Sequence, residues 1–249
     1  EDGKKRYLAL SGLFFGIGAA SKWTCIYAGA GLAVIWALHW IVRAHHRKDD
    51  ERGGDLFGKF LRNCGFCVVF FVLVPAAIYY VSYYHYGAAK GLTGIGAFFT
   101  KEYAQIVLDN QSFMFTYHSG VTASHPYSSR WYQWVLDIRP ILYYLDYGTD
   151  GTRQSFGAFV NPILCWAGLI ALFVLGYEAV AKRDRRAAFI LIGYLAQLLP
   201  WVFITRITFE YHYFACTVFL ILALGYVIAL MRQWNPRWRV YAVGMAVLC

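Results

Sequence analysis

Charged residues are scarce in this chain, and their scarcity argues against a soluble protein. Only 15% of the 249 residues are Asp, Glu, Lys or Arg, whereas 59% are hydrophobic and 19% are aromatic. A soluble domain has about 25% charged residues and about 45–50% apolar ones. Apolar runs of about 20 residues match the roughly 30 Å hydrocarbon core of a bilayer. We therefore expect an integral membrane protein.

Several functional motifs are also missing from the sequence. It has no phosphate-binding Gly-rich loop, no Gly-x-Ser-x-Gly motif and no dinucleotide fingerprint. Cys64-x-x-Cys67 has the spacing of a metal or redox site, but no second pair completes it, and we expect no metal. Acidic residues are rare in the apolar runs. This argues against a proton-coupled transporter, because such a protein needs carboxylates at membrane depth.

Basic residues are in excess, giving a formal net charge of +9. They cluster in short segments between the apolar runs, above all in 43–59 and 182–186. That distribution follows the positive-inside rule of membrane proteins and not the pattern of a nucleic-acid-binding surface. Both segments are therefore expected on the cytoplasmic side, and nucleic acid is not expected as a partner.

The apolar runs predict an all-α, polytopic bundle. Residues 7–42 are too many for one span, since one helix would reach about 54 Å at about 1.5 Å per residue. A helical hairpin with its tip at Ser21–Thr24 accommodates them. We expect one membrane domain over 1–249, as a fragment of a longer protein. The remaining spans are expected at 60–84 with a kink at Pro75, at 162–181, 187–205 and 211–231, and, truncated, at 239–249.

Residues 85–161 form the longest region without a span, and by alternation they lie on the non-cytoplasmic side. Phe98 to Tyr117 carries apolar residues near helical spacing, which predicts a helix on the membrane surface. Ile141 to Tyr147 and Arg153 to Val160 flank the turn Gly148–Gly151, which predicts a short β-hairpin.

The segment from His125 to Trp134 is the most informative part of that region. It reads His-Pro-Tyr-Ser-Ser-Arg-Trp-Tyr-Gln-Trp, which is too polar for a lipid span. Arg130, and Arg139 shortly after it, carry planar guanidinium groups that bind two phosphate oxygens at once. The face of Trp131 suits a sugar ring or an isoprenoid chain. The alternative is an aromatic belt at the membrane interface, with Arg at the lipid headgroups.

Further polar residues border the predicted spans. Lys22 lies at the hairpin tip, where an ionisable residue either serves function or snorkels to the interface. Arg206 and Glu210 have the i, i+4 spacing of a helical ion pair, and we expect a structural pair. His212 either contacts a polar ligand or satisfies a backbone carbonyl.

These residues together resemble the protein O-mannosyltransferases, glycosyltransferase family 39 of the GT-C superfamily. The matching segments stand in the family's order from residue 20 to residue 214. They are the run from His125 with Arg139-Pro140 and Tyr143-Tyr144, Ala20-Ser-Lys-Trp-Thr24, Asn161-Pro162, Leu199-Pro-Trp201, and Arg206-Ile-Thr-Phe-Glu-Tyr-His212-Tyr-Phe.

The resemblance implies a GT-C-type bundle that transfers mannose from a polyprenyl-phosphate carrier to Ser or Thr of exported proteins. It implies a multi-pass protein surrounded by membrane lipids, with its active face non-cytoplasmic and the lipid-linked sugar as the donor in place of a cofactor. The residues that it implies for donor or acceptor binding are Lys22, His125, Arg130, Trp131, Arg139, Arg206 and His212.

The chain also departs from the family's pattern. The family's catalytic Asp-Glu pair follows its first span, and no such segment is found here, so no catalytic residue is assigned. Residues 85–161 leave no room for the large soluble domain of eukaryotic members, which indicates a bacterial-type member in the plasma membrane. Glu210 replaces an expected uncharged residue. A GT-C transferase with a lipid or glycan acceptor and a non-catalytic membrane partner subunit remain as alternatives.

Overall fold

The computed structural model describes residues 3–46, 53–234 and 238–248. The chain divides into two compact units, residues 1–120 and residues 121–249. Within the described residues, four helical stretches are long and apolar enough to cross a membrane: Trp23–His45, Asp55–Ala89, Pro162–Ala181 and Glu210–Gln233. The expectation of a helical, multi-pass membrane protein is therefore confirmed, while a single domain over the whole chain stays a prediction.

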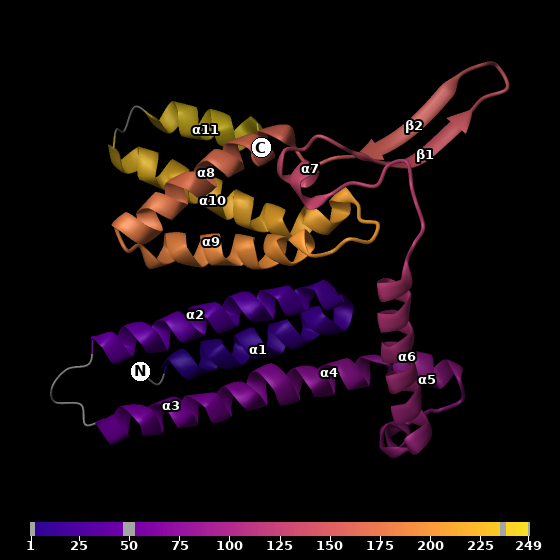
Figure 1. The fold of residues 1–249 in the computed structure, drawn as a ribbon, viewed down its shortest axis with the longest axis vertical. Coiled ribbons are helices and arrows are strands. Elements are labelled where there is room, and N and C mark those ends of the chain that lie inside the picture. The colour runs from indigo at the N-terminus through magenta and orange to yellow at the C-terminus, as the bar shows by residue number, and fades with distance from the viewer. Residues whose placement is uncertain (1–2, 47–52, 235–237, 249) are drawn as a thin grey trace. The chain divides into compact units, whose positions relative to one another are not determined.

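The N-terminal unit begins with a helical hairpin (Figure 1). Helix α1 (Gly3–Ser21) ends before Lys22, whose extended backbone (φ −157°) interrupts the helix. The 3-10 turn η1 (Trp23–Cys25) then leads into α2 (Ile26–His45). The turn thus lies where the length of the apolar run requires it.

The next helix accommodates Pro75 without breaking. It runs as α3 (Gly53–Val68), the π-helical turn η2 (Val69–Leu73), α4 (Val74–Ser82) and α5 (Tyr84–Ala89). A proline lacks the backbone donor and clashes with the carbonyl one turn earlier. The wider π turn just before Pro75 is a usual way to relieve that clash. Gly16 of α1 permits close packing here, because a Cβ at this position would lie 2.9 Å from the Cα of Pro75.

The unit ends with the 3-10 helix η3 (Ile95–Phe99) and with α6 (Lys101–Gly120). Tyr103 of α6 is fully buried, and its hydroxyl donates to the Tyr80 carbonyl at 2.9 Å. The Tyr80 hydroxyl in turn donates to the Phe98 carbonyl at 2.9 Å, so both α6 and η3 are held against α4. The helix expected near residues 98–117 is therefore present, and its position on a membrane surface stays a prediction.

The core of the C-terminal unit is a bundle of three helices that pack pairwise. They are α8 (Pro162–Ala181), α9 (Arg185–Leu198) and α10 (Phe214–Trp234), and α11 (Arg239–Leu248) follows. Small and aliphatic side chains that recur at helical spacing meet inside the bundle, which is why the helices approach closely. The buried members are Leu164, Cys165, Ala171, Leu172, Leu175, Ala187, Ile190, Leu198, Cys216, Leu220, Ala223 and Leu224.

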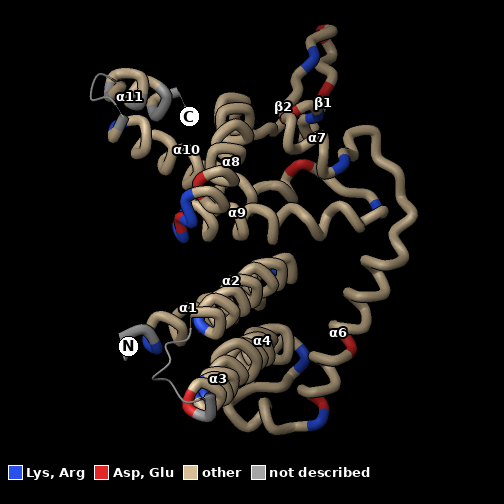
Figure 2. The backbone as a smooth tube through the Cα atoms, turned by 60° about the vertical axis from the view of Figure 1, so that its left-hand side comes forward, with Lys and Arg blue, Asp and Glu red and all other residues tan. Residues whose placement is uncertain are grey.

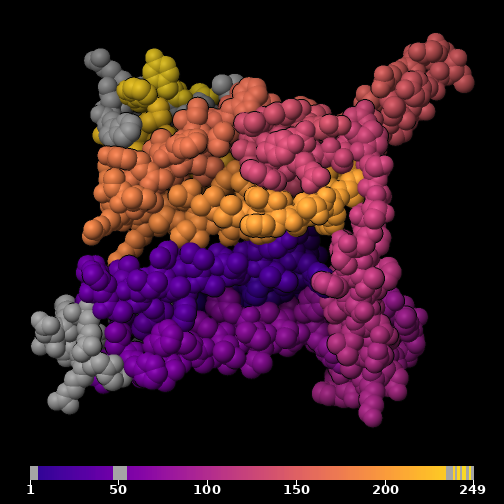
Figure 3. All heavy atoms as spheres, in the orientation of Figure 1, coloured from indigo at the N-terminus to yellow at the C-terminus, as the bar shows by residue number. Residues whose placement is uncertain are grey.

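The predicted β-hairpin is confirmed. Strands β1 (Ile141–Tyr147) and β2 (Arg153–Ala158) pair antiparallel, with Ile141 opposite Ala158 and Tyr147 opposite Arg153. The register shifts between Leu142 and Tyr144, which marks a bulge. Figure 3 shows the hairpin projecting from the rest of its unit.

Helix α9 is shorter than the span expected at 187–205. It ends at Leu198 and continues only as the 3-10 turn η4 (Leu199–Val202), since Pro200 cannot donate a bond to an α-helix. Residues 203–209 then form an irregular segment that leads into the 3-10 turn η5 (Glu210–Tyr213) at the start of α10. The chain therefore approaches α10 as an irregular segment and not as a continued helix.

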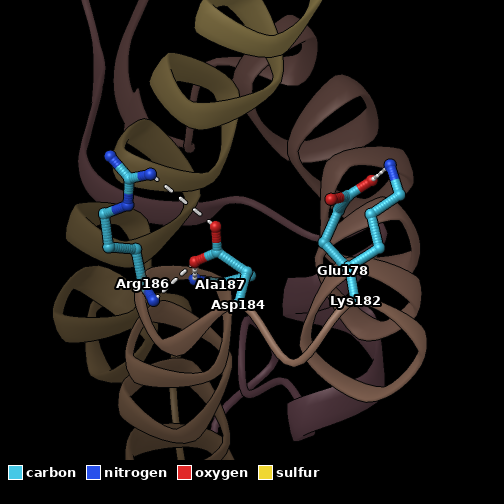
Figure 4. Close-up of polar contacts among 5 residues, drawn as sticks. All are labelled: Glu178, Lys182, Asp184, Arg186 and Ala187. Atoms are coloured by element: carbon cyan, nitrogen blue, oxygen red, sulfur yellow. Dashed lines mark hydrogen bonds and ion pairs between the residues drawn. The ribbon is translucent and has the colours of Figure 1, made fainter.

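The connection between α8 and α9 concentrates charge at one end of the bundle (Figure 2). The Lys182 Nζ lies 2.7 Å from Oε1 of Glu178, which is buried. Asp184 Oδ1 accepts hydrogen bonds from the backbone N–H groups of Arg186 (2.7 Å) and Ala187 (3.1 Å), so it caps the first turn of α9 (Figure 4). An Asp at this position satisfies donors that a helix start leaves unpaired.

Removal of the Asp184 cap is expected to destabilise the C-terminal unit by about 1 kcal/mol. The backbone hydrogen bond from Ala187 is the main cause that lowers the pKa of this carboxyl. A carboxylate with a lowered pKa stabilises the fold at neutral pH, and that contribution is lost as the pH falls through its folded-state pKa. Thermal unfolding of Asp184→Ala in detergent at neutral pH measures the effect.

Asp184→Asn is the matched control for this prediction, because Asn caps helices about as well as Asp but does not titrate. It should keep the neutral-pH stability and lack the part of the acid-dependent loss that Asp184 causes. An Asn variant as unstable as the Ala variant at neutral pH would contradict the capping role.

Candidate functional site

Two segments of the C-terminal unit, residues 125–139 and residues 206–212, are joined by a reciprocal pair of hydrogen bonds. The Ser129 N–H donates to the Thr208 carbonyl at 2.9 Å, and the Thr208 hydroxyl donates to the Ser129 carbonyl at 2.6 Å. Both residues are buried. Buried hydrogen bonds of this kind are costly to break, so they hold the two segments together. We call this arrangement the loop pair.

An aromatic cluster reinforces the loop pair. Trp134 of the short helix α7 (Trp131–Val135) is buried, and its Nε1 donates to the Ser129 hydroxyl at 2.8 Å. The ring of His212 lies nearly parallel to it, with 5.9 Å between centroids and an angle of 16°. Trp201 contacts both rings, at 5.6 Å and 4.5 Å. The His212 Nδ1 also lies 2.8 Å from the Phe209 carbonyl oxygen, which is the backbone role considered for it.

His125 and Arg139 hold the other end of the loop pair. The ring of His125 meets that of Phe209 edge-on at 5.2 Å, and its Nδ1 accepts from the Tyr127 N–H at 3.1 Å. The Arg139 guanidinium donates to the Pro126 carbonyl. The His-Pro turn is therefore attached both to the segment after α7 and to the segment before α10.

The cationic side chains lie at the surface of this arrangement. Arg130 is exposed directly beside the buried Ser129, and its N–H donates to the Gln133 side chain at 2.8 Å. Trp131 is half-buried and begins α7. Arg206 is also half-buried, and its guanidinium donates to the Ile207 carbonyl at 3.1 Å. Guanidinium groups beside aromatic faces form a surface that suits a phosphate attached to an apolar or sugar group.

The structure brings most of the candidate residues together. Those on the loop pair are His125, Arg130, Trp131, Arg139, Arg206 and His212. Lys22 belongs to the N-terminal unit, where the neighbouring Trp23 donates to the Tyr79 hydroxyl at 2.7 Å. A role of Lys22 in donor or acceptor binding stays a prediction.

The expected ion pair between Arg206 and Glu210 is wrong. Residues 203–209 are irregular, so the i, i+4 spacing does not place the two side chains on one helical face. Glu210 is instead 2% exposed, and its Oε1 accepts from the Val160 N–H at 3.3 Å. Its carboxyl also lies beside that of Asp137.

Sequence reasoning did not single out Ser129, Thr208 or Asp137. A buried Ser or Thr carries no periodic signal, and Asp137 follows the aromatic run as an isolated carboxylate. Among the described residues, no group of three or more His, Cys, Asp or Glu is placed to hold a metal ion. The chemistry that the loop pair offers is therefore that of cations, aromatic faces and hydroxyls.

Comparisons with known proteins point to one family. Residues 104–249 match the model described as the C-terminal four TMM region of protein-O-mannosyltransferase. The polyprenol-phosphate-mannose--protein mannosyltransferase of Mycolicibacterium smegmatis is 26% identical over an alignment 268 positions long, which covers 96% of this chain and 50% of that protein. The protein of the same name from Mycobacterium tuberculosis is 30% identical over 121 residues, which cover 45% of this chain and 23% of that protein.

No solved structure matches the chain. It spans about half the length of the Mycolicibacterium smegmatis relative. The family match covers all of α6 to α11 except the first three residues of α6, and so includes both segments of the loop pair. The chain therefore belongs to the protein-O-mannosyltransferase family.

Proposed function

We propose that the whole protein transfers mannose from polyprenyl-phosphate-mannose to Ser or Thr of exported proteins, and that this chain is its C-terminal part. The names of the relatives give the donor and a protein acceptor for those proteins. The loop pair supports the proposal for this chain, because three Arg residues and two His residues share one hydrogen-bonded arrangement there.

The loop pair would act on the phosphate of the donor. Transfer of the sugar leaves a negative phosphate, and preorganised cations stabilise the charge that develops on it. Arg130 and Arg139 supply guanidinium groups, with the latter oriented by Pro126. The half-buried Trp131 offers a face to the sugar or to the first isoprenoid units. His125 lies on the same turn and would orient the phosphate or the acceptor.

The acceptor hydroxyl needs a general base. By resemblance to the family, that base is a carboxylate of an Asp-Glu pair carried by a segment outside this chain. The loop pair would then bind and orient the donor, and the proton transfer would occur elsewhere in the whole protein.

The connectivity of the bundle supports a site on the non-cytoplasmic side of the membrane. Helix α8 starts beside the loop pair and ends at the basic connection 182–186, and α9 returns from there. The loop pair and that connection thus lie at opposite ends of the bundle. Since basic connections remain in the cytoplasm, the loop pair would face the other side.

The proposal is tested with the full-length parent protein in membranes, given radiolabelled polyprenyl-phosphate-mannose and a Ser/Thr-rich peptide. Arg130→Ala and His125→Ala should each lower transfer by about tenfold or more, since an interaction of about 1.4 kcal/mol corresponds to a factor of ten. Arg153→Ala is the matched control. That Arg is exposed on the β-hairpin and contacts Tyr147, so its loss should leave transfer within about twofold of wild type.

The other outcomes are equally informative. Label in lipid or glycan but not in peptide would replace the protein acceptor with a lipid or glycan acceptor. No transfer to any acceptor by a correctly inserted wild type would favour a non-catalytic partner subunit. Equal transfer by the Arg130, His125 and Arg153 variants would favour the alternative in which the loop pair is an aromatic belt at the membrane interface.

A further inference from the structure

Asp137 occupies a position where glycine is usually found. Its φ of 52° lies in the left-handed region, directly after α7. The Asp137 N–H donates to the Trp134 carbonyl at 3.1 Å, and the Ile138 N–H donates to the Gln133 carbonyl at 3.0 Å. These two bonds define a Schellman helix end, which usually has Gly at the position of Asp137. A side chain retained at a strained position points to a use for that side chain.

The residue that lies next to Asp137 indicates what its side chain does. Its carboxyl lies beside the carboxyl of Glu210, which is buried at the start of η5. Asp137 Oδ1 and Glu210 Oε2 are both buried, and neither has a hydrogen-bond donor as its partner. Two ionised carboxylates accept hydrogen bonds only, so two carboxyl groups can bond to each other only when one of them carries a proton.

The pair joins three segments that meet at the loop pair. Asp137 ends α7, which begins with Trp131. Glu210 begins η5, which contains His212. Through its other oxygen, Glu210 binds the Val160 N–H just before α8. The carboxyl pair is therefore a second attachment between α7 and η5. In the sequence, Asp137 follows Trp134, whereas Ser129 of the first attachment precedes it.

We propose that Asp137 and Glu210 share one proton and thereby position α7 and Arg139 for the proposed transfer. Both are positioning residues and touch no reacting atom. The inference rests on the proposed function for its activity measurement. While the shared proton is bound, one hydrogen bond joins the two carboxyl groups and holds α7 against η5. Without the proton, two negative charges face each other in a buried site, and their repulsion separates α7 from η5.

The charged and titratable groups near the pair do not replace that proton. The buried Cys165 of α8 is a titratable group in the same unit. A thiol is never positively charged, so it cannot neutralise the two carboxyls. The guanidinium of Arg139 donates to the Pro126 carbonyl, and the ring of His212 is stacked on Trp134. Arg206 donates to the Ile207 carbonyl.

The experiment compares variants that mimic or remove the shared proton, in the full-length protein in membranes. Glu210→Gln keeps an oxygen for Val160 and offers an N–H to Asp137, so it imitates the protonated form at every pH. It should transfer mannose within about twofold of wild type at neutral pH. Glu210→Ala leaves Asp137 and Val160 without their partner and should lose about tenfold or more.

The pH profile separates positioning from a merely structural role. Wild-type transfer should fall by about tenfold as alkaline pH removes the shared proton, whereas Glu210→Gln should keep a flat profile over the same range. At position 137, Asn should behave like Gln at 210. Asp137→Gly should lose transfer even though glycine suits the helix end better, since it removes the carboxyl without disturbing the turn.

The results distinguish this inference from the proposed function. Absence of transfer by wild type with any acceptor overturns the function. Active wild type with the same pH profile in Glu210→Gln, or an Asp137→Gly variant as active as wild type, overturns the shared proton alone. A Glu210→Gln variant that folds but is as inactive as Glu210→Ala also overturns it, because the amide restores both hydrogen bonds.

Discussion

Trp134→Ala is expected to detach the loop pair and to lower the free energy of unfolding by about 3–5 kcal/mol, the usual cost of removing a buried Trp. The indole is 1% exposed, donates to the Ser129 hydroxyl at 2.8 Å and contacts the rings of His212 and Trp201. Its truncation leaves a cavity beneath both segments. Thermal unfolding in detergent measures the loss, and mannosyl transfer should fall with it.

Two neighbouring substitutions serve as controls. Trp131→Ala removes an indole that is only half-buried on the same helix, so its stability loss should be well below that of Trp134→Ala. Trp134→Phe keeps an aromatic ring but removes the hydrogen bond to Ser129, and should cost about 1–3 kcal/mol. Equal losses in Trp131→Ala and Trp134→Ala would show that burial of Trp134 does not hold the loop pair.

The second large effect is expected at a pair of buried tyrosines. The hydroxyls of Tyr194 on α9 and Tyr213 on η5 lie 2.8 Å apart, and the two residues are 3% and 1% exposed. Tyr194→Phe or Tyr213→Phe leaves the other hydroxyl buried without its partner, which costs about 1–3 kcal/mol. The double variant removes both polar groups and should recover most of that stability.

A double-mutant cycle in detergent tests this prediction. Both single variants should unfold at lower temperature than wild type, and the double variant should unfold close to it. Additive losses would mean that the hydroxyls stabilise the bundle independently, through groups other than each other. The result bears on function because Tyr213 adjoins His212 and so fixes the start of α10 beneath the loop pair.

Local patterns were enough to predict much of the fold. The long apolar run required a turn near Lys22, and α1 ends at Ser21. The Gly148–Gly151 turn between two short apolar runs predicted the hairpin of β1 and β2. The pattern was less informative at α9, where apolar residues continue beyond Leu198 although Pro200 ends the α-helix. Apolarity alone does not reveal where a helix stops.

Only part of the candidate site could be predicted from local sequence patterns. The polar, aromatic character of the run from His125 marked it as unlike a lipid span, and this run does form part of one of the two segments of the loop pair. The ion pair expected from the spacing of Arg206 and Glu210 is wrong, because that spacing has meaning only within a helix. The true partner of Glu210, Asp137, lies far away in sequence.

By itself, the sequence determined the membrane class, the helices and the family, because length, hydropathy and local motifs act within a few residues of one another. The tertiary structure decided which polar groups meet. The bond between Thr208 and Ser129 joins residues 79 positions apart, and that between Val160 and Glu210 joins residues 50 apart. Contacts over such separations depend on how the helices pack, since a buried polar group needs a partner wherever the fold brings one.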